Sequence, residues 1–474
     1  MTDAGQAVSS PSVMQLLPAW LEQQRWFVGR GRVPRLRRIG GLRHEDPAGR
    51  AGLETHLLLD ESAAEPTLYQ VPLSYRADRL PGGDDALVAT VEDDTLGTLH
   101  IYDGPRDPAF AEVLLQSMLA ETAVASSGDD GASHAQGHRQ PGSPDLTVRA
   151  SRVLRGEQSN TSVIYDTTSS DGGAQPLICK IFRVLHHGEN PDVVVQSALA
   201  LGGSHLVPRP FGHVSGEWPD ERLAGGLATG HLAFAQEFLP GVEDAWRVAG
   251  EALARGEDFS DRARALGRAT AEVHATLAAV LPTVEATDRD RAALLASMQA
   301  RHANANNEVP ALAAYDKDAR AIFAAAAVAD WPLLQRIHGD YHLGQVLDVP
   351  GRGWVLLDFE GEPMRPLSER SVPDLPLRDV AGMLRSFDYA AGSWEQSHAG
   401  GSAARWAEAA RTAFLDGYAE SSGHDPRAER ALLAALELDK ALYEVVYEAR
   451  NRPGWLTIPV SAIARLTDSA RSNR

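Results

Sequence analysis

Short runs in which apolar and polar positions alternate fill the early part of the chain. Alternation of this kind predicts β-strands, because successive side chains of a strand point to opposite faces. The runs, separated by Gly, Asp and Pro, lie near residues 53–59, 68–74, 86–91 and 97–102. An amphipathic pattern from Val13 to Phe27 predicts a preceding helix, in which Pro18 marks a kink or a fresh start. We therefore expect a small β-rich subdomain over residues 1–90.

The strand pattern continues to about residue 240. It predicts a hairpin within residues 151–165 and strands at 177–183 and 231–239. Residues 126–145 differ, because they are rich in Ser, Gly, Asp, His and Pro and have almost nothing to bury. We therefore expect a β-rich lobe over residues 91–240 that contains a mobile insert at 126–145.

From residue 241 to residue 474 the apolar positions recur at helical spacing. Ala- and Leu-rich amphipathic runs lie near 259–281, 287–304, 308–328, 375–391, 402–421 and 426–449. A β-rich half followed by a helical half predicts an α+β protein with two lobes.

Composition narrows the classes of function. Hydrophobic residues make up 43% of the 474 residues and charged residues 23%, which is typical of a globular chain. The formal net charge of −19 would repel nucleic acids and anionic membranes, so we expect neither as a partner. The single cysteine, Cys179, lies in an apolar run and is expected to be a buried thiol. The chain shows no signal-peptide pattern and no membrane-spanning stretch, which predicts a cytoplasmic protein.

Candidate chemistry gathers in two loops that follow one another in the helical half. The first carries His338-Gly339-Asp340-Tyr341-His342-Leu343-Gly344-Gln345, and the second carries Asp358-Phe359-Glu360-Gly361-Glu362. Phosphoryl transfer needs a carboxylate that takes the proton of the attacking hydroxyl and oxygen ligands for Mg²⁺. We assign Asp340 as the base, and Gln345 and Asp358 as the Mg²⁺ ligands. Their order resembles the catalytic loop and the Asp-Phe-Gly element of protein kinases.

Three stretches of the β-rich half suit the binding of ATP. Lys180 interrupts a continuous apolar strand, a costly place for a charge unless phosphate oxygens bind it. Ser159, Asn160 and Thr161 form a polar hairpin tip, where backbone N–H groups can approach phosphate. The strand at 231–239 takes the place of the kinase hinge, and we expect adenine to pair with its backbone at Gln236, Glu237 and Phe238.

The usual partner of such a lysine is a glutamate on the next helix. Here that helix is expected to begin near Asn190-Pro191-Asp192, and its body, residues 193–199, contains no glutamate. Glu189 and Asp192 are the substitutes that the sequence offers, without a basis for choosing between them.

The motifs together resemble those of the actinobacterial maltokinases, a branch of the aminoglycoside phosphotransferase-like kinases. The resemblance runs from Arg25 to Leu466 and is most specific over 330–466, where it includes Pro376 to Phe387 and Tyr443 to Leu456. It implies a two-lobed protein-kinase-like fold with an N-terminal cap subdomain, and ATP and Mg²⁺ as cofactors.

The same resemblance implies transfer of the ATP γ-phosphate to the anomeric hydroxyl of maltose for α-glucan or glycogen synthesis. It also implies a sugar pocket that includes Tyr443, Tyr447 and Arg465, and we add His342 to this pocket. It further implies trehalose synthase as a possible protein partner. Tyr443 and Tyr447 are four residues apart and so share a helix face, which suits stacking on a sugar, although helix packing explains the same spacing.

Two alternatives stay open. A related branch phosphorylates glucosamine, and Tyr341 stands where maltokinases have Leu. An amino sugar needs a carboxylate near its ammonium group, whereas Glu444 and Glu448 each lie one residue from a tyrosine and so point to another side of the helix. We therefore favour maltose. The other alternative is a non-catalytic kinase fold that binds a nucleotide for regulation, which the presence of Lys180 and Asp340 disfavours.

Overall fold

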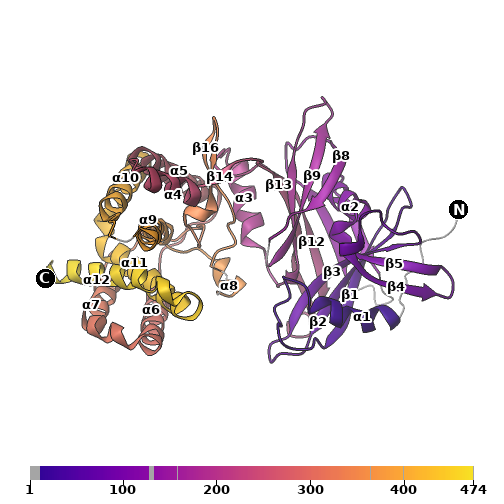
Figure 1. Cartoon of the computed structure of the whole chain (residues 1–474), viewed down its shortest axis with the longest axis horizontal. Helices are drawn as coiled ribbons and strands as arrows, with labels where there is room; N and C mark the ends of the chain where they lie inside the picture. Colours follow the sequence, from indigo (N-terminus) through magenta and orange to yellow (C-terminus); the bar gives the residue numbers. More distant parts are fainter. Residues whose placement is uncertain (1–10, 128–132, 157–158, 363–364, 399, 473–474) are drawn as a thin grey trace. The chain divides into compact units, whose positions relative to one another are not determined.

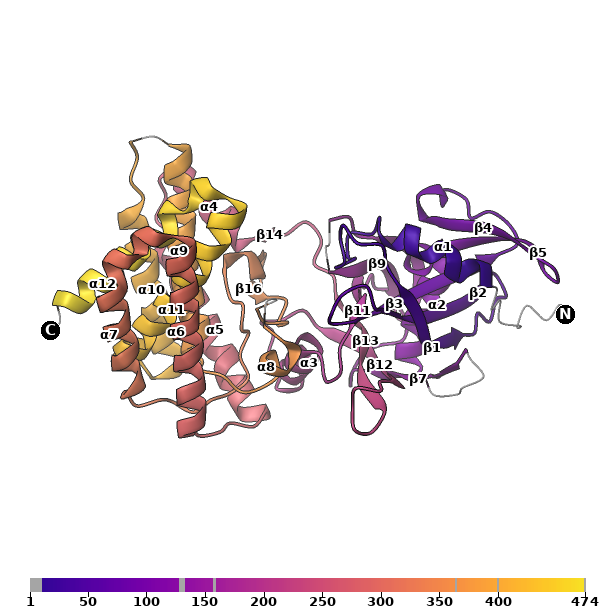
Figure 2. The ribbon, with the colours of Figure 1, turned by 90° about the horizontal axis from the view of Figure 1, so that it is seen from below.

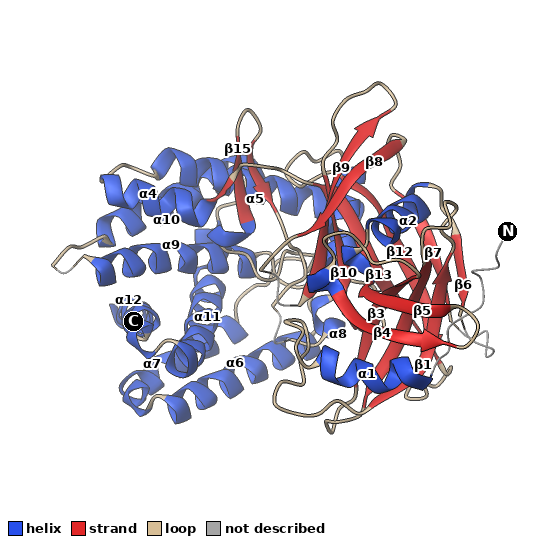
Figure 3. Ribbon diagram, turned by 45° about the vertical axis from the view of Figure 1, so that its right-hand side comes forward, coloured by secondary structure: helices blue, strands red, loops and turns tan. Residues whose placement is uncertain are grey.

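The chain divides into two compact units in the computed structural model. The structure describes residues 11–127, 133–156, 159–362, 365–398 and 400–472. Unit 1 comprises Met1–Val193 and Pro208–Leu239, and unit 2 comprises Val194–Val207 and Pro240–Arg474. Strands dominate the first and helices the second, so the predicted α+β class is confirmed (Figure 3).

One large, mostly antiparallel sheet organises unit 1. The described strands are β1 (Leu36–His44), β2 (Gly52–Asp60), β3 (Thr67–Arg76), β4 (Leu87–Asp93), β5 (Gly97–Asp103), β6 (Ala123–Ser126), β7 (His134–Arg139), β8 (Leu146–Val153), β9 (Asn160–Ser169), β10 (Leu177–Phe182), β12 (Pro210–Pro219) and β13 (Leu227–Glu237), with β11 (Val184–Leu185) added to β3. Their order across the sheet is β4-β5-β3-β2-β1-β6-β7-β12-β13-β10-β9-β8. Figure 1 labels many of these strands.

The four predicted early strands correspond to β2, β3, β4 and β5. β1 was not predicted, because three arginines and the Gly40-Gly41 pair hide its alternation. The expected subdomain boundary at residue 90 falls inside β4, which pairs along its length with β5. The cap and the nucleotide lobe therefore share one sheet instead of separating at that point.

The expectation of a mobile insert over 126–145 is wrong for much of the segment. β7 lies inside the sheet between β6 and β12, in register from Gly212 opposite Arg139 to Glu217 opposite His134. Few of its side chains are apolar, so the backbone ladder and not a hydrophobic pattern holds the strand. Residues 128–132 of the same prediction lie outside the described residues.

Close packing of α2 (Pro108–Leu119) on the sheet explains one glycine of β7. A Cβ on Gly137 would lie 1.9 Å from the carbonyl oxygen of Ser117 in α2. Asp107 caps this helix by accepting a hydrogen bond from the N–H of Ala109. α1 (Pro11–Leu21) is shorter than the helix predicted over 13–27. It contributes Leu17 and Leu21 to a hydrophobic cluster that also contains Trp26.

A buried arginine connects the N-terminal part of unit 1 to strand β9. Arg183 is fully buried, and its guanidinium lies 4.6 Å from the ring centre of Trp26. It also donates to Asp103 Oδ1 at 2.7 Å and to Thr161 Oγ1 at 2.8 Å. Paired and hydrogen-bonded, this charge can be buried, whereas an isolated one could not.

Helices make up most of unit 2 (Figure 2). They are the end of α3 (Pro191–Leu201), then α4 (Ala245–Arg255), α5 (Ser260–Val280), α6 (Asp288–Glu308), α7 (Asp316–Ala327), α8 (Leu367–Arg370), α9 (Leu377–Ser397), α10 (Ala404–Ser422), α11 (Arg430–Asn451) and α12 (Thr457–Ser472). A three-stranded sheet of β14 (Glu243–Asp244), β15 (Val346–Val349) and β16 (Gly353–Leu356) carries the loops of interest.

The helical runs predicted from the sequence correspond to α5, α6, α7, α9, α10 and α11. Most ends agree to within about four residues, but α7 begins only at Asp316 and α9 extends to Ser397. One core joins these helices, and it includes Val195, Leu199 and Val207 from the segment that precedes β12. No helix among the described residues is long and apolar enough to cross a lipid bilayer.

Candidate active site

Asp379, in the first turn of α9, holds the loop that bears Asp340 by hydrogen bonds to its backbone. One carboxylate oxygen accepts from the N–H of His338 at 2.8 Å, and the other from the N–H of Gly339 at 2.9 Å. His274 Nε2 is 3.0 Å from the same carboxylate, which is 2% exposed. Asp379 thus holds the backbone that presents Asp340. Sequence reasoning did not assign it this role, because its only local signal is a place near the start of a helix.

Two glycines let the Asp340 loop approach the loop that follows β16. Gly339 and Gly361 both have positive φ angles, +85° and +73°. A Cβ on Gly339 would lie 3.1 Å from the Cα of Gly361, so the two backbones are nearly in contact. Any side chain at residue 339 would combine a strained backbone with a crowded one.

Lys440 of α11 is the nearest cation to Asp340. Its Nζ lies 3.1 Å from Asp340 Oδ1, and the aspartate side chain is 22% exposed. Burial by itself would raise the pKa of the Asp340 carboxyl, but the charges of Lys440 and His342 outweigh this effect and lower the pKa. The Asp340 carboxylate is therefore ionised at neutral pH, as a base must be.

The two neighbours of Asp340 face different surroundings. His342 Nδ1 accepts from the N–H of Gly344 at 3.1 Å, and burial lowers the pKa of its imidazole. Tyr341 instead points into the core, where it is 3% exposed and its hydroxyl is 2.9 Å from Thr270 Oγ1. The Leu-to-Tyr departure at residue 341 is therefore a core substitution and says nothing about the acceptor.

Gln345 and Asp358, the predicted Mg²⁺ ligands, are in contact. Gln345 Nε2 donates to Asp358 Oδ2 at 3.2 Å. Asp358 has a φ of +62°, one of two non-glycine residues with a positive φ among the described residues. Such a conformation costs on the order of 1–2 kcal/mol and is concentrated at functional sites.

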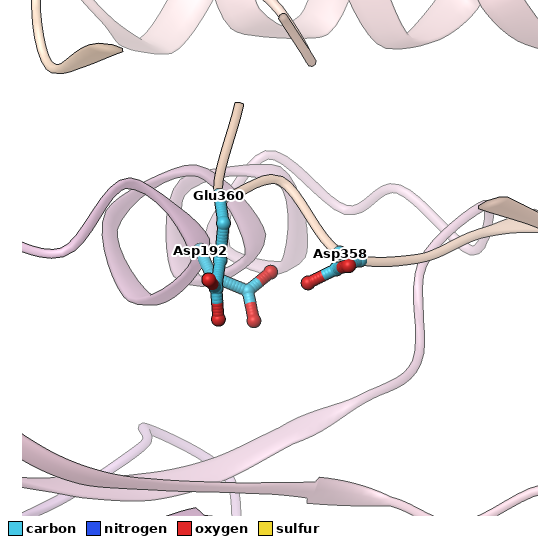
Figure 4. Close-up of side chains that lie close together, drawn as sticks. All are labelled: Asp192, Asp358 and Glu360. Atoms are coloured by element: carbon cyan, nitrogen blue, oxygen red, sulfur yellow. The ribbon is translucent and has the colours of Figure 1, made fainter. Parts of the chain in front are cut away.

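Glu360 joins this group, although the sequence analysis gave it no role. Carboxylate oxygens of Asp358 and Glu360 lie within 4.8 Å of one another on the loop after β16. Figure 4 shows both side chains on this loop, and it also labels Asp192 of α3. The charge of Arg370 interacts with both carboxylates and offsets part of their mutual repulsion, which a bound cation would reduce further. Oxygen donors in this number suit Mg²⁺, so the donor set fits the metal that phosphoryl transfer needs.

In unit 1, Lys180 forms an ion pair with Asp192. Its Nζ lies 2.8 Å from Asp192 Oδ2, and the aspartate side chain is fully buried. The N–H of Asp192 donates to Asn190 Oδ1 at 2.9 Å, which fixes the start of α3. Of the two substitutes that the sequence offered, Asp192 takes the place of the usual glutamate.

Of the three residues predicted to form a phosphate-binding hairpin tip, two lie inside a strand. Asn160 and Thr161 belong to β9, opposite Phe182 and Ile181 of β10. The Thr161 hydroxyl is buried and accepts from Arg183, so it is part of the sheet interior. Ser159 is exposed just before the strand. Residues 157–158 of the same hairpin lie outside the described residues.

The predicted hinge uses two of its N–H groups inside unit 1. The N–H of Glu237 donates to Arg209 O at 2.8 Å, and that of Phe238 donates to Pro176 O at 2.9 Å. Gln236 is buried at the end of β13, in register with Ile178. Since both N–H groups already donate to protein carbonyls, the prediction that adenine receives a hydrogen bond from the N–H of Glu237 or Phe238 is not borne out.

The predicted sugar residues separate into two places around α11. Tyr443 lies beside the Asp340 loop, since its ring centre is 5.0 Å from Lys440 Nζ. Tyr447 follows one turn later and is 46% exposed. Arg465 lies elsewhere, because it pairs with Asp388 at 2.7 Å and approaches Glu437 at 3.7 Å. Glu437 is six residues from Tyr443, which is about 120° around the helix. The structure does not bring Arg465 to the tyrosines.

The expected orientation of the α11 glutamates is confirmed. Glu444 pairs with Arg385 at 2.7 Å, and Glu448 accepts from the Tyr389 hydroxyl at 3.1 Å. Both therefore turn towards α9 and not towards the ring of Tyr443.

Glu362 supplies a carboxylate that the sequence analysis did not consider. It is 7% exposed, and its nearest cations are Arg301 Nη1 at 3.7 Å and Lys440 Nζ at 4.0 Å. Among the described residues no donor is within hydrogen-bond distance of this carboxylate. A buried carboxylate with only loose ion pairs can still accept a cationic or hydroxyl donor.

Two family models match the chain. The maltokinase N-terminal cap domain matches residues 20–107, and the phosphotransferase enzyme family matches residues 152–432.

Several characterised proteins are similar to the chain. The glucosamine kinase of Streptacidiphilus jiangxiensis is 31% identical over 333 residues, which are 66% of this chain and 72% of that protein. The glucosamine kinase of Mycolicibacterium smegmatis is 30% identical over 344 residues, 69% of this chain and 82% of that protein. A solved glucosamine kinase in complex with glucosamine, ADP and inorganic phosphate has a TM-score of 0.65 at 24% identity. The match covers 96% of this chain and 98% of that one, so the two proteins share a fold.

Proposed function

Because the chain belongs to the phosphotransferase enzyme family and carries a maltokinase N-terminal cap domain, we propose that it is an ATP-dependent kinase that phosphorylates a hydroxyl of glucosamine. The observation that carries the choice of acceptor is the identity of 30–31% to two glucosamine kinases over most of their length. Neither of these two relatives is named as a kinase of maltose, the acceptor that we favoured from the sequence.

In this proposal the two units supply different parts of the reaction. Lys180, held by Asp192, binds phosphate oxygens of ATP, with the β9 hairpin and the β13 segment as its neighbours in unit 1. Asp340 takes the proton of the attacking hydroxyl. Asp358, with Gln345 and Glu360, would hold Mg²⁺, which neutralises charge on the transferred phosphoryl group.

Glu362 is the residue through which the structure favours an amino sugar. Its buried carboxylate lacks a hydrogen-bond donor among the described residues, and its neighbour Lys440 also contacts Asp340. An ammonium group on the sugar would give Glu362 the close partner that it lacks, and Tyr443 would offer a ring face to the same sugar.

Maltose remains the second candidate, for one reason. Lys440 and Arg301 already place positive charge beside Asp340 and Glu362, which reduces the attraction of this region for an ammonium group. A neutral sugar would meet no such opposition. Nothing in the matched families or relatives points to trehalose synthase as a partner.

A coupled assay of ADP release with Mg²⁺ and ATP tests the proposal. The acceptors are glucosamine, N-acetylglucosamine, glucose and maltose, each at the same range of concentrations. We expect the highest kcat/KM for glucosamine, with N-acetylglucosamine much poorer because it lacks the charge. Preference for maltose would replace the acceptor and leave the kinase intact, whereas turnover with none of these sugars would contradict the proposed function.

A further inference from the structure

The side chain of Lys440 connects α11 to the Asp340 loop, 100 residues earlier in the chain. Its Nζ lies 3.1 Å from Asp340 Oδ1, 4.0 Å from Glu362 Oε1 and 5.0 Å from the ring centre of Tyr443. The lysine side chain is only 26% exposed. A single ammonium group therefore contacts the proposed base and approaches both residues that we place beside the sugar.

The ion pair between Lys440 and Asp340 differs from an ordinary surface ion pair because Lys440 is largely buried. Burial alone would lower the pKa of the Lys440 ammonium, but Asp340 and Glu362 reverse the effect and raise it. The charge is kept at a cost in desolvation, which a solvated pair on the surface would not bear. No requirement of helix packing calls for a cation at this position of α11, since a Leu or Met of similar length would fill the same space.

We propose that Lys440 is a positioning residue of the phosphoryl transfer, which acts by holding the Asp340 carboxylate ionised and in one orientation. This inference rests on the proposed function. In the transfer, the hydroxyl oxygen of the sugar bonds to the γ-phosphorus while the bond from that phosphorus to the bridging oxygen of ADP breaks. The hydroxyl proton passes to Asp340. Lys440 itself makes and breaks no covalent bond.

The other charged groups around Asp340 are accounted for. His338 and His342 flank it on its own loop. Around Lys440 lie Glu362, which also approaches Arg301 of α6, and Glu444 of α11. The Nε2–H of His338 donates to the carbonyl oxygen of Leu357 at 2.8 Å, so the backbone fixes the orientation of its ring. Of the described cations, Lys440 is the one with an ion pair to Asp340.

The test compares three variants over a range of pH. Lys440→Met keeps the length of the side chain without its charge, and Lys440→Arg keeps the charge. The control is Arg450→Met, which removes a different ion pair of α11, the exposed one to Glu308 at 2.7 Å. All three are assayed for kcat and KM with ATP, Mg²⁺ and the preferred sugar.

For Lys440→Met we expect kcat to fall by about 10-fold or more, with a smaller change in the KM for ATP. Removal of the cation raises the pKa of Asp340, so the acid limb of the kcat/KM profile should move up by about one pH unit or more. Lys440→Arg should restore most of that shift, and Arg450→Met should leave the profile in place. An acid limb that does not move in Lys440→Met would overturn the inference, even if activity falls.

A second measurement does not depend on turnover. A double-mutant cycle of Lys440→Met with Asp340→Asn, followed by chemical denaturation, reports the coupling between the two residues. We expect the coupling at pH 7 and its loss at a pH where Asp340 is protonated. Coupling without turnover on any sugar would contradict the proposed function alone, whereas turnover without coupling would contradict the role of Lys440 alone.

Discussion

At the scale of single residues, the site depends on side chains whose local conformation or partner is unusual. Asp358 has a left-handed backbone, Lys180 is buried against Asp192, and Glu362 is a buried carboxylate without a close donor among the described residues. Each has a free-energy cost that ordinary packing would avoid, and such costs are found where a ligand is bound. Three predictions follow from these residues.

Asp358→Gly should separate stability from activity. Glycine relieves the positive φ, so the free energy of unfolding should stay the same or rise by about 1 kcal/mol, while Mg²⁺-dependent turnover is lost. Asp358→Ala loses turnover too but keeps the strain. Denaturant melts and activity assays of both variants check this, and near-normal activity in either would remove Asp358 from the metal site.

Asp192→Asn should weaken the use of ATP. Without its carboxylate partner, the Lys180 ammonium is no longer held in place, so kcat/KM for ATP should fall by about 10-fold, which corresponds to about 1.4 kcal/mol. Glu189→Gln, which neutralises the other acid that the sequence offered as a partner, is the comparison and should retain most activity. Equal losses in the two variants would show that Asp192 has no special role.

Glu362→Gln should act on the sugar and not on the nucleotide. If Glu362 accepts the ammonium group of glucosamine, the KM for glucosamine should rise by about 10-fold or more, because a charge-assisted hydrogen bond is replaced by a neutral one. The KM for ATP should change little. Glu369→Gln, an exposed glutamate paired with Arg365, serves as the control. An unchanged KM for glucosamine would move the ammonium site elsewhere.

At the scale of elements, hydrophobic periodicity identified the strands and helices that carry a regular core face. β2 to β5 and the helices α5, α6, α7, α9, α10 and α11 have such a face, and they were predicted, with the largest boundary error at the start of α7. β7 has none, and it is held by its ladder to β12 and by its contact with α2. Backbone pairing with a distant strand leaves no periodic signal in the strand itself.

Gly137→Ala tests the place of β7 in the sheet. The added Cβ would lie 1.9 Å from a backbone oxygen of α2, so strand and helix must move apart, at a cost of about 1–3 kcal/mol. Gly225→Ala is the control, because a Cβ there meets nothing within 4 Å and its φ is not positive. Thermal melts of both variants check the difference. Equal stabilities would restore the idea of a dispensable insert.

At the scale of the whole molecule, the division into units does not follow a single cut in the sequence. Unit 1 ends at Leu239 and unit 2 resumes at Pro240, close to the boundary expected at residues 240–241, yet residues 194–207 also belong to unit 2. Val195, Leu199 and Val207 contribute buried side chains to its core. The segment returns to unit 1 at Pro208, so neither unit is one continuous piece of chain.

A fragment of residues 241–474 should therefore be much less stable than the same region in the full chain. It lacks three buried apolar side chains, each worth about 1.5–3 kcal/mol when fully buried. Circular dichroism on heating should show a broad transition or a much lower Tm than the full chain. Cooperative unfolding at the Tm of the full chain would mean that residues 194–207 contribute little to this core.

The sequence by itself determined the parts of this protein whose signal is local. The α+β class and the order of Lys180, Asp340, Gln345 and Asp358 follow from periodicity and from short motifs, since each lies within a few residues of its own evidence. The same local signals made Asp192 a candidate partner of Lys180 without selecting it, because Glu189 lies three residues away and only the start of α3 decides between them.

Tertiary structure decided whatever depends on residues that are far apart in the chain. Asp379 binds Gly339 of the Asp340 loop from 40 residues away, and Lys440 contacts Asp340 from 100 residues away, on separate helices. Glu362 approaches Lys440 from the loop after β16, a contact that no local pattern of the sequence indicates. Helix periodicity fixes only which residues share a face, whereas the packing of helices and loops decides what that face meets.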